Sequence, residues 1–217
     1  MGAAVNHAAA SGAPALTLVP SPSEVTLSSV PCTMTYGKDD GDANGDGSRT
    51  VRAAFKSIEE GAFTLACDGI TDPGNLGAIL RTAECAGVTG VVLPRHRAAH
   101  ITPTVAKTAA GAVEHLRMVV VGGLPATMKT LSQRGIWTVG LDAGGERSIF
   151  DLPVADEPVA LVVGAEGSGL SRLVRERCDT IASIPMAGVL DSLNVSNAAA
   201  ISVYEITRRR AEASGGN

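Results

Sequence analysis

From residue 63 onward, short apolar runs alternate with longer mixed segments. The apolar runs contain four to six residues with little polar alternation, a pattern typical of strands buried on both faces of a sheet. They predict six strands, at 63–67, 90–93, 116–121, 136–141, 159–163 and 180–184. The segments between them predict helices at 74–86, 104–112, 125–134 and 170–177, and a closing helix at 194–213. Strands that alternate with helices predict an α/β fold with a parallel sheet and helices on both faces.

The first 60 residues differ from this pattern. Residues 1–31 are rich in Ala, Ser and Pro, with apolar residues for a strand or two at most, and residues 37–48 consist mostly of Gly and Asp. We therefore expect a short irregular segment with a flexible linker at 1–60, followed by the main domain at 61–217. The linker also resembles a calcium loop at 42–47, but the twelfth position, which needs a bidentate carboxylate, is Ala53. A plain linker is the favoured interpretation.

Composition and charge limit the class of protein. Hydrophobic residues make up 45% of the chain and aromatic residues only 3%, so we expect a core of Ala, Val, Leu and Ile. The formal net charge of −4 argues against a protein that coats nucleic acid, but leaves room for local basic patches. No apolar run approaches the roughly 18 residues of a membrane span. No Lys or Arg precedes Lys38, so neither a secretion signal nor a transit peptide is predicted, and we expect a cytoplasmic protein with no membrane partner.

No metal site is predicted. Four cysteines lie in or beside apolar runs and form no C-x-x-C pair, which indicates reduced, buried thiols rather than disulfides or metal ligands. They are Cys32, Cys67, Cys85 and Cys178. His96 and His100 could form a metal pair, but no Cys or acid accompanies them at a ligand spacing. A basic loop at 95–100 that contacts phosphate is the better interpretation.

Two segments that follow predicted strands combine glycine with polar residues, at the usual location of a ligand site in an α/β protein. The sequence Asp-Pro-Gly-Asn at 72–75 opens a helix that carries Arg81. The sequence Gly-Ala-Glu-Gly-Ser-Gly at 164–169 lets a ligand approach the backbone closely, and a simple turn would not need Glu166. Its glycine order differs from G-x-G-x-x-G and it follows a late strand, so a nicotinamide or flavin site is disfavoured.

A third segment, 183–197, joins the last predicted strand to the closing helix. Pro185 ends the strand, and Ser192 and Asn194 precede the first helical alanines. Ser and Asn side chains cap helices because they accept hydrogen bonds from unpaired backbone N–H groups. The segment therefore gathers polar side chains at a strand-to-helix junction, and it is the centre of the predicted site.

Together, the three segments resemble the SpoU (TrmH-type) family of RNA 2′-O-ribose methyltransferases in the SPOUT superfamily. The matching stretches are 72–83, 161–170 and 184–196, and three motifs in this order and spacing are highly specific. The resemblance covers about 63–210. Residues 98–116 look most like the subgroup that methylates a guanosine of 23S ribosomal RNA.

The resemblance implies a trefoil knot in the last third of the chain, S-adenosyl-L-methionine as cofactor, and a homodimer. It implies a structured ribosomal or transfer RNA as substrate, and not DNA. The implied cofactor contacts are Gly164, Ile184 and Leu193. The implied catalytic residues are Asn75, Arg81, Glu166, Ser192 and Asn194. Similar proteins carry a small RNA-binding domain before the catalytic one, so residues 1–60 are interpreted as its remnant, with a truncated start as the alternative.

The implied reaction is attack of a ribose 2′-hydroxyl on a sulfonium methyl group, so the hydroxyl must lose its proton. The family account often gives the position of Arg81 the role of base, but a guanidinium stays protonated in proteins. We expect Arg81, oriented by Glu166 and Asn75, to bind the neighbouring phosphate and stabilise the developing alkoxide, so that the phosphate can take the proton. Ser192 and Asn194 would position ribose and cofactor.

Two other functions stay open at this point. One is the same chemistry on a guanosine of transfer RNA, which the sequence hardly separates from ribosomal RNA. The other is a protein that binds RNA or cofactor without turnover. The complete polar set argues against the second, since Arg81, Glu166 and Asn194 would then have been free to drift.

Overall fold

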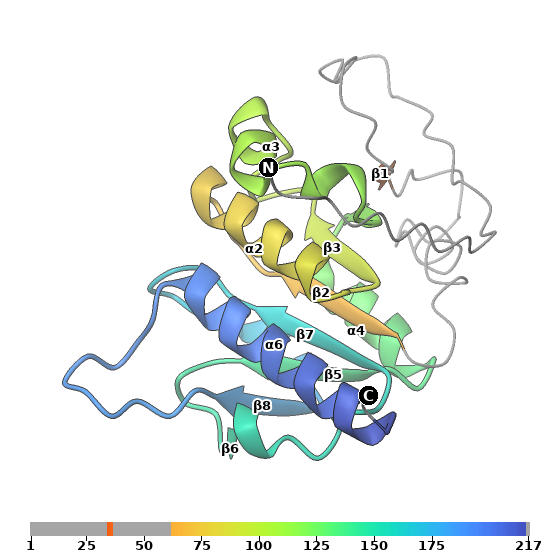
Figure 1. Cartoon of the computed structure of the whole chain (residues 1–217). Helices are drawn as coiled ribbons and strands as arrows, with labels where there is room; N and C mark the ends of the chain where they lie inside the picture. The colour runs from red at the N-terminus through yellow and green to blue at the C-terminus, as the bar shows by residue number, and fades with distance from the viewer. Residues whose placement is uncertain (1–33, 37–61, 216–217) are drawn as a thin grey trace, which may run out of the picture.

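The computed structural model describes residues 34–36 and 62–215. Its centre is an eight-stranded sheet with the strand order β1-β4-β3-β2-β7-β5-β8-β6 (Figure 1). Every strand pairs parallel to its neighbours. The strands are β1 (Met34–Tyr36), β2 (Phe63–Cys67), β3 (Gly90–Pro94), β4 (Met118–Val121), β5 (Trp137–Leu141), β6 (Arg147–Ser148), β7 (Val159–Val163) and β8 (Thr180–Ser183). All six predicted apolar runs form strands, which confirms the parallel α/β fold.

Helices cover both faces of this sheet, as predicted (Figure 1). One face is covered by α2 (Pro73–Cys85), α3 (Pro103–Ala109) and α6 (Val195–Ala213), together with the short 3-10 helices η1 (Ala112–Glu114) and η2 (Ile149–Asp151). The other face is covered by α4 (Leu124–Ser132) and α5 (Arg172–Arg177).

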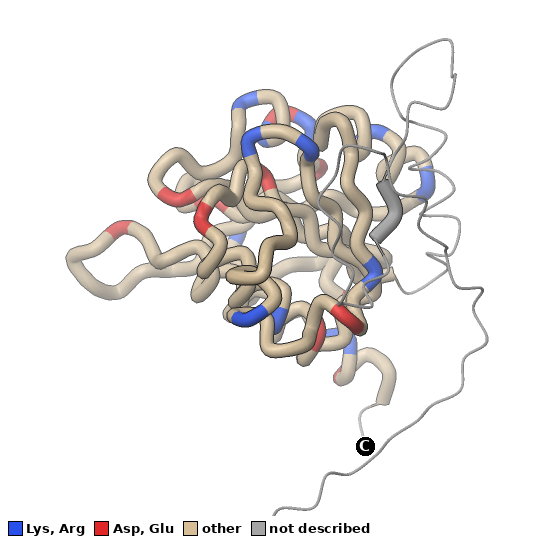
Figure 2. Tube along the Cα trace, turned by 90° about the horizontal axis from the view of Figure 1, so that it is seen from above, with Lys and Arg blue, Asp and Glu red and all other residues tan. Residues whose placement is uncertain are grey.

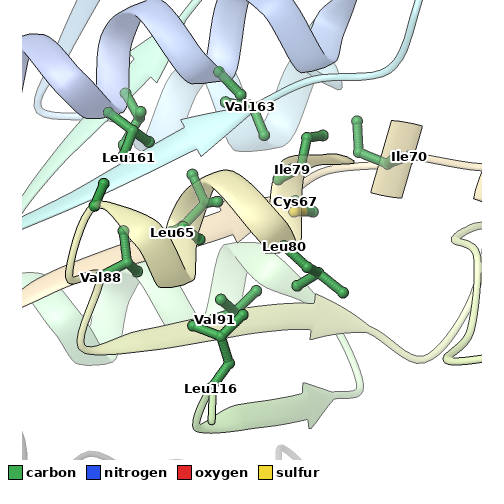
Figure 3. Packing of buried hydrophobic residues seen from close by; sticks show 14 of the residues in the cluster. Leu65, Cys67, Ile70, Ile79, Leu80, Val88, Val91, Leu116, Leu161 and Val163 are labelled. Atoms are coloured by element: carbon green, nitrogen blue, oxygen red, sulfur yellow. The ribbon is translucent and has the colours of Figure 1, made fainter. Parts of the chain in front are cut away.

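The strands divide their side chains between two cores, because successive residues of a strand point to opposite faces. In β2, Leu65 and Cys67 face the core under α2 and α6, whereas Ala66 faces the core under α4. Figure 3 shows the first core, where side chains of β2 gather with Ile79 and Leu80 of α2. Full burial of one leucine contributes about 1.5–3 kcal/mol to folding. The aliphatic core predicted from the composition is confirmed.

The amino end of α2 is fixed by its first residues. Asp72 is the N-cap, and its Oδ2 accepts a hydrogen bond of 2.7 Å from the backbone N–H of Asn75. Pro73 is the first helical residue, where a missing N–H costs nothing. Gly77 faces α3, and a Cβ at this position would lie 2.5 Å from Cβ of Thr108, so glycine lets the two helices pack closely. These features hold Asn75 at the carboxyl edge of the sheet.

One strand is inserted between two strands that are consecutive in the chain. β8 lies between β5 and β6, although β5 and β6 follow each other directly in the chain. The connection from β5 to β7 therefore passes around the outside of β8, where Ser183 Oγ donates to the carbonyls of Gly145 and Arg147. A Cβ on Gly145 would lie 2.5 Å from the carbonyl carbon of Ala182, so the two backbones touch. This arrangement is consistent with the trefoil knot, which stays a prediction.

The structure differs from the predicted elements in several places. The pattern does not predict β1, and the two residues of β6 are too few to give a period. The predicted helix at 104–112 divides into α3 and η1, because Ala110 and Gly111 both adopt positive φ angles of 50° and 91°. The helix predicted from residue 170 begins at Arg172.

The other expectations for the first 60 residues lie outside the described part of the chain. They concern the linker with its calcium-like loop, the apolar strands near the amino end and the thiol of Cys32. Among the helices of residues 62–215, none is long and apolar enough to cross a membrane.

Candidate active site

The three segments singled out in the sequence leave the same edge of the sheet. They follow β2, β7 and β8, and the carboxyl ends of parallel strands lie together. β2 and β7 are direct neighbours, with Cys67 paired to Val163 at their ends. Just beyond them, a Cβ on Gly69 would lie 3.5 Å from Cβ of Ala165. The segments that begin at residues 68 and 164 are therefore in contact.

Asn194 joins all three segments. Its Nδ2 donates hydrogen bonds of 2.6 Å to Oε1 of Glu166 and 3.1 Å to Oδ1 of Asn75. Its Oδ1 accepts from the backbone N–H and the hydroxyl of Ser196, at 2.9 Å and 2.6 Å, and this makes Asn194 the N-cap of α6. A carboxylate accepts only and a backbone N–H donates only, so a single orientation of the amide satisfies both sides. One side chain thus starts the last helix and holds Asn75 beside Glu166.

Two polar atoms of this cluster have no hydrogen-bond partner among the described residues. Oδ1 of Asn75 accepts from Asn194, so the Nδ2 of Asn75 is a donor with no partner in residues 62–215. Likewise, Oε1 of Glu166 accepts from Asn194, and Oε2 has no partner there. Glu166 is exposed and Asn75 is partly exposed. The cluster therefore presents one hydrogen-bond donor and one carboxylate oxygen to an incoming polar group.

A pocket of about 320 Å³ opens beside this cluster. It is lined by the segments that follow β5, β7 and β8 and by the first turns of α6. Among the residues predicted for the site, it includes Gly164, Glu166, Ile184, Ser192 and Leu193. All three predicted cofactor residues thus line one pocket, and Asn75 and Asn194 lie next to it through Glu166.

Gly164 is required by the fold of the loop itself. A Cβ at this position would overlap the backbone of Gly169 and Leu170. Ala165 and Gly169 exchange two backbone hydrogen bonds, of 3.0 Å and 2.9 Å, which close the loop into a tight turn. The sequence suggested that glycine here lets a ligand come close. The structure shows that it first lets the loop close on itself.

Arg81 lies apart from the other predicted catalytic residues. It is exposed on α2, about one and a half turns beyond Asn75, and makes no hydrogen bond or ion pair within the described residues. The expectation that Glu166 and Asn75 orient Arg81 is wrong for this structure, because both bond to Asn194 instead. Ser192 also lies outside the cluster: its Oγ donates to Oδ1 of Asp191 at 3.3 Å, and it does not cap α6.

An ion pair at the pocket was not predicted from the sequence. Asp142 lines the pocket, and its Oδ1 pairs with Nη1 of Arg175 at 2.7 Å and accepts from the N–H of Gly144 at 3.0 Å. Burial acts to raise the pKa of Asp142, but hydrogen bonds from the Gly144 N–H and from Arg175 outweigh it, and the pKa is lowered. An acidic residue directly after an apolar strand was the available signal, since parallel strands place such positions at the ligand edge.

The cysteine prediction is partly wrong. Cys67 is buried, and Cys178 is partly buried, and burial raises the pKa of each thiol to about 12. Cys85 is exposed at the end of α2, because it lies on the outer face of that helix. None of these three cysteines forms a disulfide. No cluster of His, Cys, Asp and Glu suited to a metal ion occurs within 62–215.

The parallel sheet, with a glycine-lined pocket and a polar cluster at its carboxyl edge, defines an α/β protein with a ligand site at that edge. The family model of the SpoU rRNA Methylase family matches residues 62–204, and this chain belongs to that family. The family resemblance inferred from the three motifs is therefore confirmed.

Known proteins with similar sequences or structures carry related names. The chain is 47% identical over 164 residues to 23S rRNA (guanosine-2′-O-)-methyltransferase RlmB of Pseudomonas aeruginosa, covering 76% of this chain and 66% of that protein. It is 46% identical over 153 residues to RlmB of Ralstonia nicotianae, covering 70% and 61%. The SpoU methyltransferase AviRb of Streptomyces viridochromogenes, solved in complex with the cofactor AdoMet, superposes with a TM-score of 0.66 at 32% identity, over 72% of this chain and 63% of that one. The chain thus spans less than two thirds of the length of these relatives.

Proposed function

We propose that this protein transfers a methyl group from S-adenosyl-L-methionine to a ribose 2′-hydroxyl of RNA. The observation that carries the proposal is the cluster around Asn194, which brings Asn75 and Glu166 together beside a pocket of cofactor size. Two relatives named as guanosine 2′-O-methyltransferases and a similar structure that holds AdoMet support it.

The pocket fits this cofactor in size and charge. Its volume of about 320 Å³ is within the usual range for small-molecule sites. Three carboxylates line it, from Asp142, Glu166 and Asp191, and the lining includes no Lys, Arg or His. S-adenosylmethionine supplies a methyl group on a positively charged sulfur, and an anionic pocket favours such a cation. Gly164, Ile184 and Leu193 would hold it, largely through backbone groups.

The polar residues would act on the RNA side of the site. The free Nδ2 of Asn75 can donate to an oxygen of the ribose, and Asn194 keeps Asn75 and Glu166 at a fixed separation. Ser192 lies on the pocket wall, where its hydroxyl can contact ribose or cofactor. Arg81 is exposed and without a protein partner among the described residues, so its guanidinium is available to bind an RNA phosphate and to stabilise the developing alkoxide.

We propose a guanosine of 23S ribosomal RNA as the substrate, because both named relatives act on that RNA. An RNA substrate of this kind favours a cytoplasmic location. We keep the interpretation of residues 1–60 as the remnant of a substrate-binding domain with a linker, and of 61–217 as the catalytic domain.

A homodimer is part of the proposal. Large apolar side chains are exposed on the loop after β8, which also lines the pocket, with Val189 fully exposed and Leu190 at 76%. On α6, Tyr204 is 52% exposed. Figure 2 shows this loop extending from the body of the protein, with an acidic position and no basic one. A second copy that covers these residues would remove apolar area from water. Light scattering after size exclusion tests this, and a monomer at micromolar concentration would count against it.

Transfer of labelled methyl from S-adenosylmethionine to RNA tests the proposed function. Total RNA is incubated with the protein and the labelled cofactor, digested to nucleosides and separated. Labelled 2′-O-methylguanosine from the 23S fraction is expected. The same labelled nucleoside from transfer RNA would show that transfer RNA, and not 23S ribosomal RNA, is the substrate. Label on a base would refute the ribose assignment. Cofactor binding with no methyl transfer would indicate a binding protein without turnover.

Variants of Arg81 test its role separately. Arg81→Ala should keep cofactor affinity in calorimetry but lose methylation, because Arg81 does not line the pocket. Arg81→Lys keeps the charge and loses the planar fork that binds phosphate through two hydrogen bonds. Near-normal turnover of Arg81→Lys would rule out a role that needs this fork.

A further inference from the structure

The glycine loop at 164–169 ends at two backbone N–H groups that are held by carboxylates. The N–H of Ser171 donates a hydrogen bond of 2.7 Å to Oδ2 of Asp68. The N–H of Leu170 donates to the carboxylate of Asp142. Asp68 follows β2 and Asp142 follows β5, and these strands are the two neighbours of β7, from which the loop leaves the sheet. The loop is therefore fastened to the strands on both of its sides.

Asp68 contacts both ends of this loop. Its backbone N–H donates a hydrogen bond of 2.7 Å to the carbonyl of Val163, directly before the loop, and its side chain accepts from Ser171, just after the loop. The bond from Ser171 is the one hydrogen bond of this carboxylate within residues 62–215. Asp68 also begins the segment that carries Asn75. One residue thus closes the loop at its base and joins it to that segment.

Asp142 lines the pocket, but donors from the protein occupy its carboxylate. Besides Leu170, these donors are Arg175, at 2.7 Å, and the backbone N–H of Gly144, at 3.0 Å. The backbone N–H of Asp142 donates to the carbonyl of Ala182 in β8 at 2.9 Å. Asp142 therefore links the glycine loop to β8 and to α5, and it shapes the wall of the pocket.

From this geometry we propose that Asp68 is a positioning residue for cofactor binding, which holds the glycine loop at its base with Asp142 as the second anchor. The inference rests on the proposed methyl transfer, with S-adenosyl-L-methionine as the bound cofactor. Residues 163–169 all line the pocket, whereas Asp68 and Ser171 do not, so Asp68 acts through the loop and not on the cofactor. The turn within the loop fixes its internal shape, and the bond from Ser171 to Asp68 fixes where that turn lies.

Two variants remove this hydrogen bond from opposite sides. Asp68→Ala removes the acceptor and should raise the Kd for S-adenosylmethionine by about tenfold in calorimetry, because binding must then order the loop. Ser171→Pro removes the donor, since proline has no N–H, and the φ angle of −62° at Ser171 fits a proline ring. Both changes remove one bond, so the double variant should lose little more affinity than either alone. Asp68→Asn keeps an oxygen that accepts from Ser171, and its Kd should stay within about threefold.

Two control variants separate positioning from loss of charge and loss of stability. Glu176→Ala removes an exposed carboxylate of α5 that lies outside the pocket lining, and Thr102→Ala removes the side-chain cap of α3. Both should bind cofactor normally, although Thr102→Ala should lower the melting temperature. In methylation assays, Asp68→Ala should raise the KM for the cofactor by about tenfold and lower kcat by less than about threefold, because saturating cofactor restores the loop.

Unchanged cofactor affinity in Asp68→Ala and Ser171→Pro would overturn the positioning role and leave the proposed methyl transfer intact. A lower melting temperature with an unchanged KM would also overturn it, and so would an equal loss of affinity in Asp68→Asn and Asp68→Ala. If the Asp68→Ala protein does not fold, the comparison of Ser171→Pro with Asp68→Asn decides. Weaker cofactor binding in the variants, with no methyl transfer by any form of the protein, would support the role of Asp68 and overturn the proposed function.

Discussion

Replacing Asn194 separates helix capping from assembly of the active site. Asn194→Ala removes the N-cap of α6, a 19-residue helix, and should lower the free energy of unfolding by about 1 kcal/mol. For a domain of this size, that loss lowers the melting temperature by about 2–4 °C. Asn194→Ser keeps a good cap, because the serine hydroxyl also accepts from the N–H of the first turn. We therefore expect Asn194→Ser to melt within about 1 °C of the unmodified protein.

The two variants should lose the same catalytic function. Serine is too short to reach Glu166 and Asn75, so both variants lose the bonds of 2.6 Å and 3.1 Å that hold these residues together. A hydrogen bond to a charged group contributes about 1.5–3 kcal/mol, so the methylation rate should fall by at least about tenfold in each. Thermal melting and single-turnover methylation measure the two effects separately. Near-normal methylation by Asn194→Ser would refute the role of the cluster, and equal melting temperatures for Ala and Ser would refute the capping argument.

Three further predictions concern the pocket and the thiols. Gly164→Ala should lower cofactor affinity in calorimetry by more than about tenfold, because its Cβ overlaps the loop backbone, whereas Gly188→Ala, with open space around it, should bind normally. Asp142→Asn should destabilise the protein by about 1 kcal/mol at pH 7 and by less at pH 3. The pKa of Asp142 is lowered in the folded state, so its stabilisation is present above the unfolded pKa and is lost as the pH falls through the folded one. Denaturant titration at both pH values checks this, and an equal effect at both would contradict it. Iodoacetamide should modify Cys85 within minutes and Cys67 only after unfolding, as read by peptide mass mapping; rapid labelling of Cys67 would show that the core opens.

Most of the fold follows from local patterns. The run Phe63–Cys67 is apolar at nearly every position, which only a doubly covered strand requires, and its bounds match the prediction. The start of α2 was readable because Asp72 and Pro73 act within their own turn. β6 could not be predicted, because two residues are too few to show the hydrophobic pattern of a strand. Its pairing with β8 also joins chain segments more than 30 residues apart.

The residues of the site could be predicted from the sequence, but the hydrogen bonds between them could not. Glu166, Asn75 and Asn194 were each expected, but Asn75 and Asn194 are 119 residues apart in the chain, and their bond depends on how three loops meet. The expected link to Arg81 failed because six residues of α2 separate it from Asn75, which places Arg81 on another, exposed face of the helix. The position of Asp142 after an apolar strand marked it as a candidate, but its pairing with Arg175 of α5 was missed because the two residues are far apart in the chain and meet only in the fold.

The position of β8 between β5 and β6 has a consequence for biosynthesis. The wall of the pocket at 142–143 is made early, but the opposite wall at 184–198 is made only after β8 has taken its place inside the sheet. β6 pairs with β8 through only two residues, so few backbone hydrogen bonds hold this outer strand in place. Because residues 184–198 line the pocket, the cofactor site is complete only when β8 and the start of α6 are in place, so cofactor binding reports on the correct placement of the last strand.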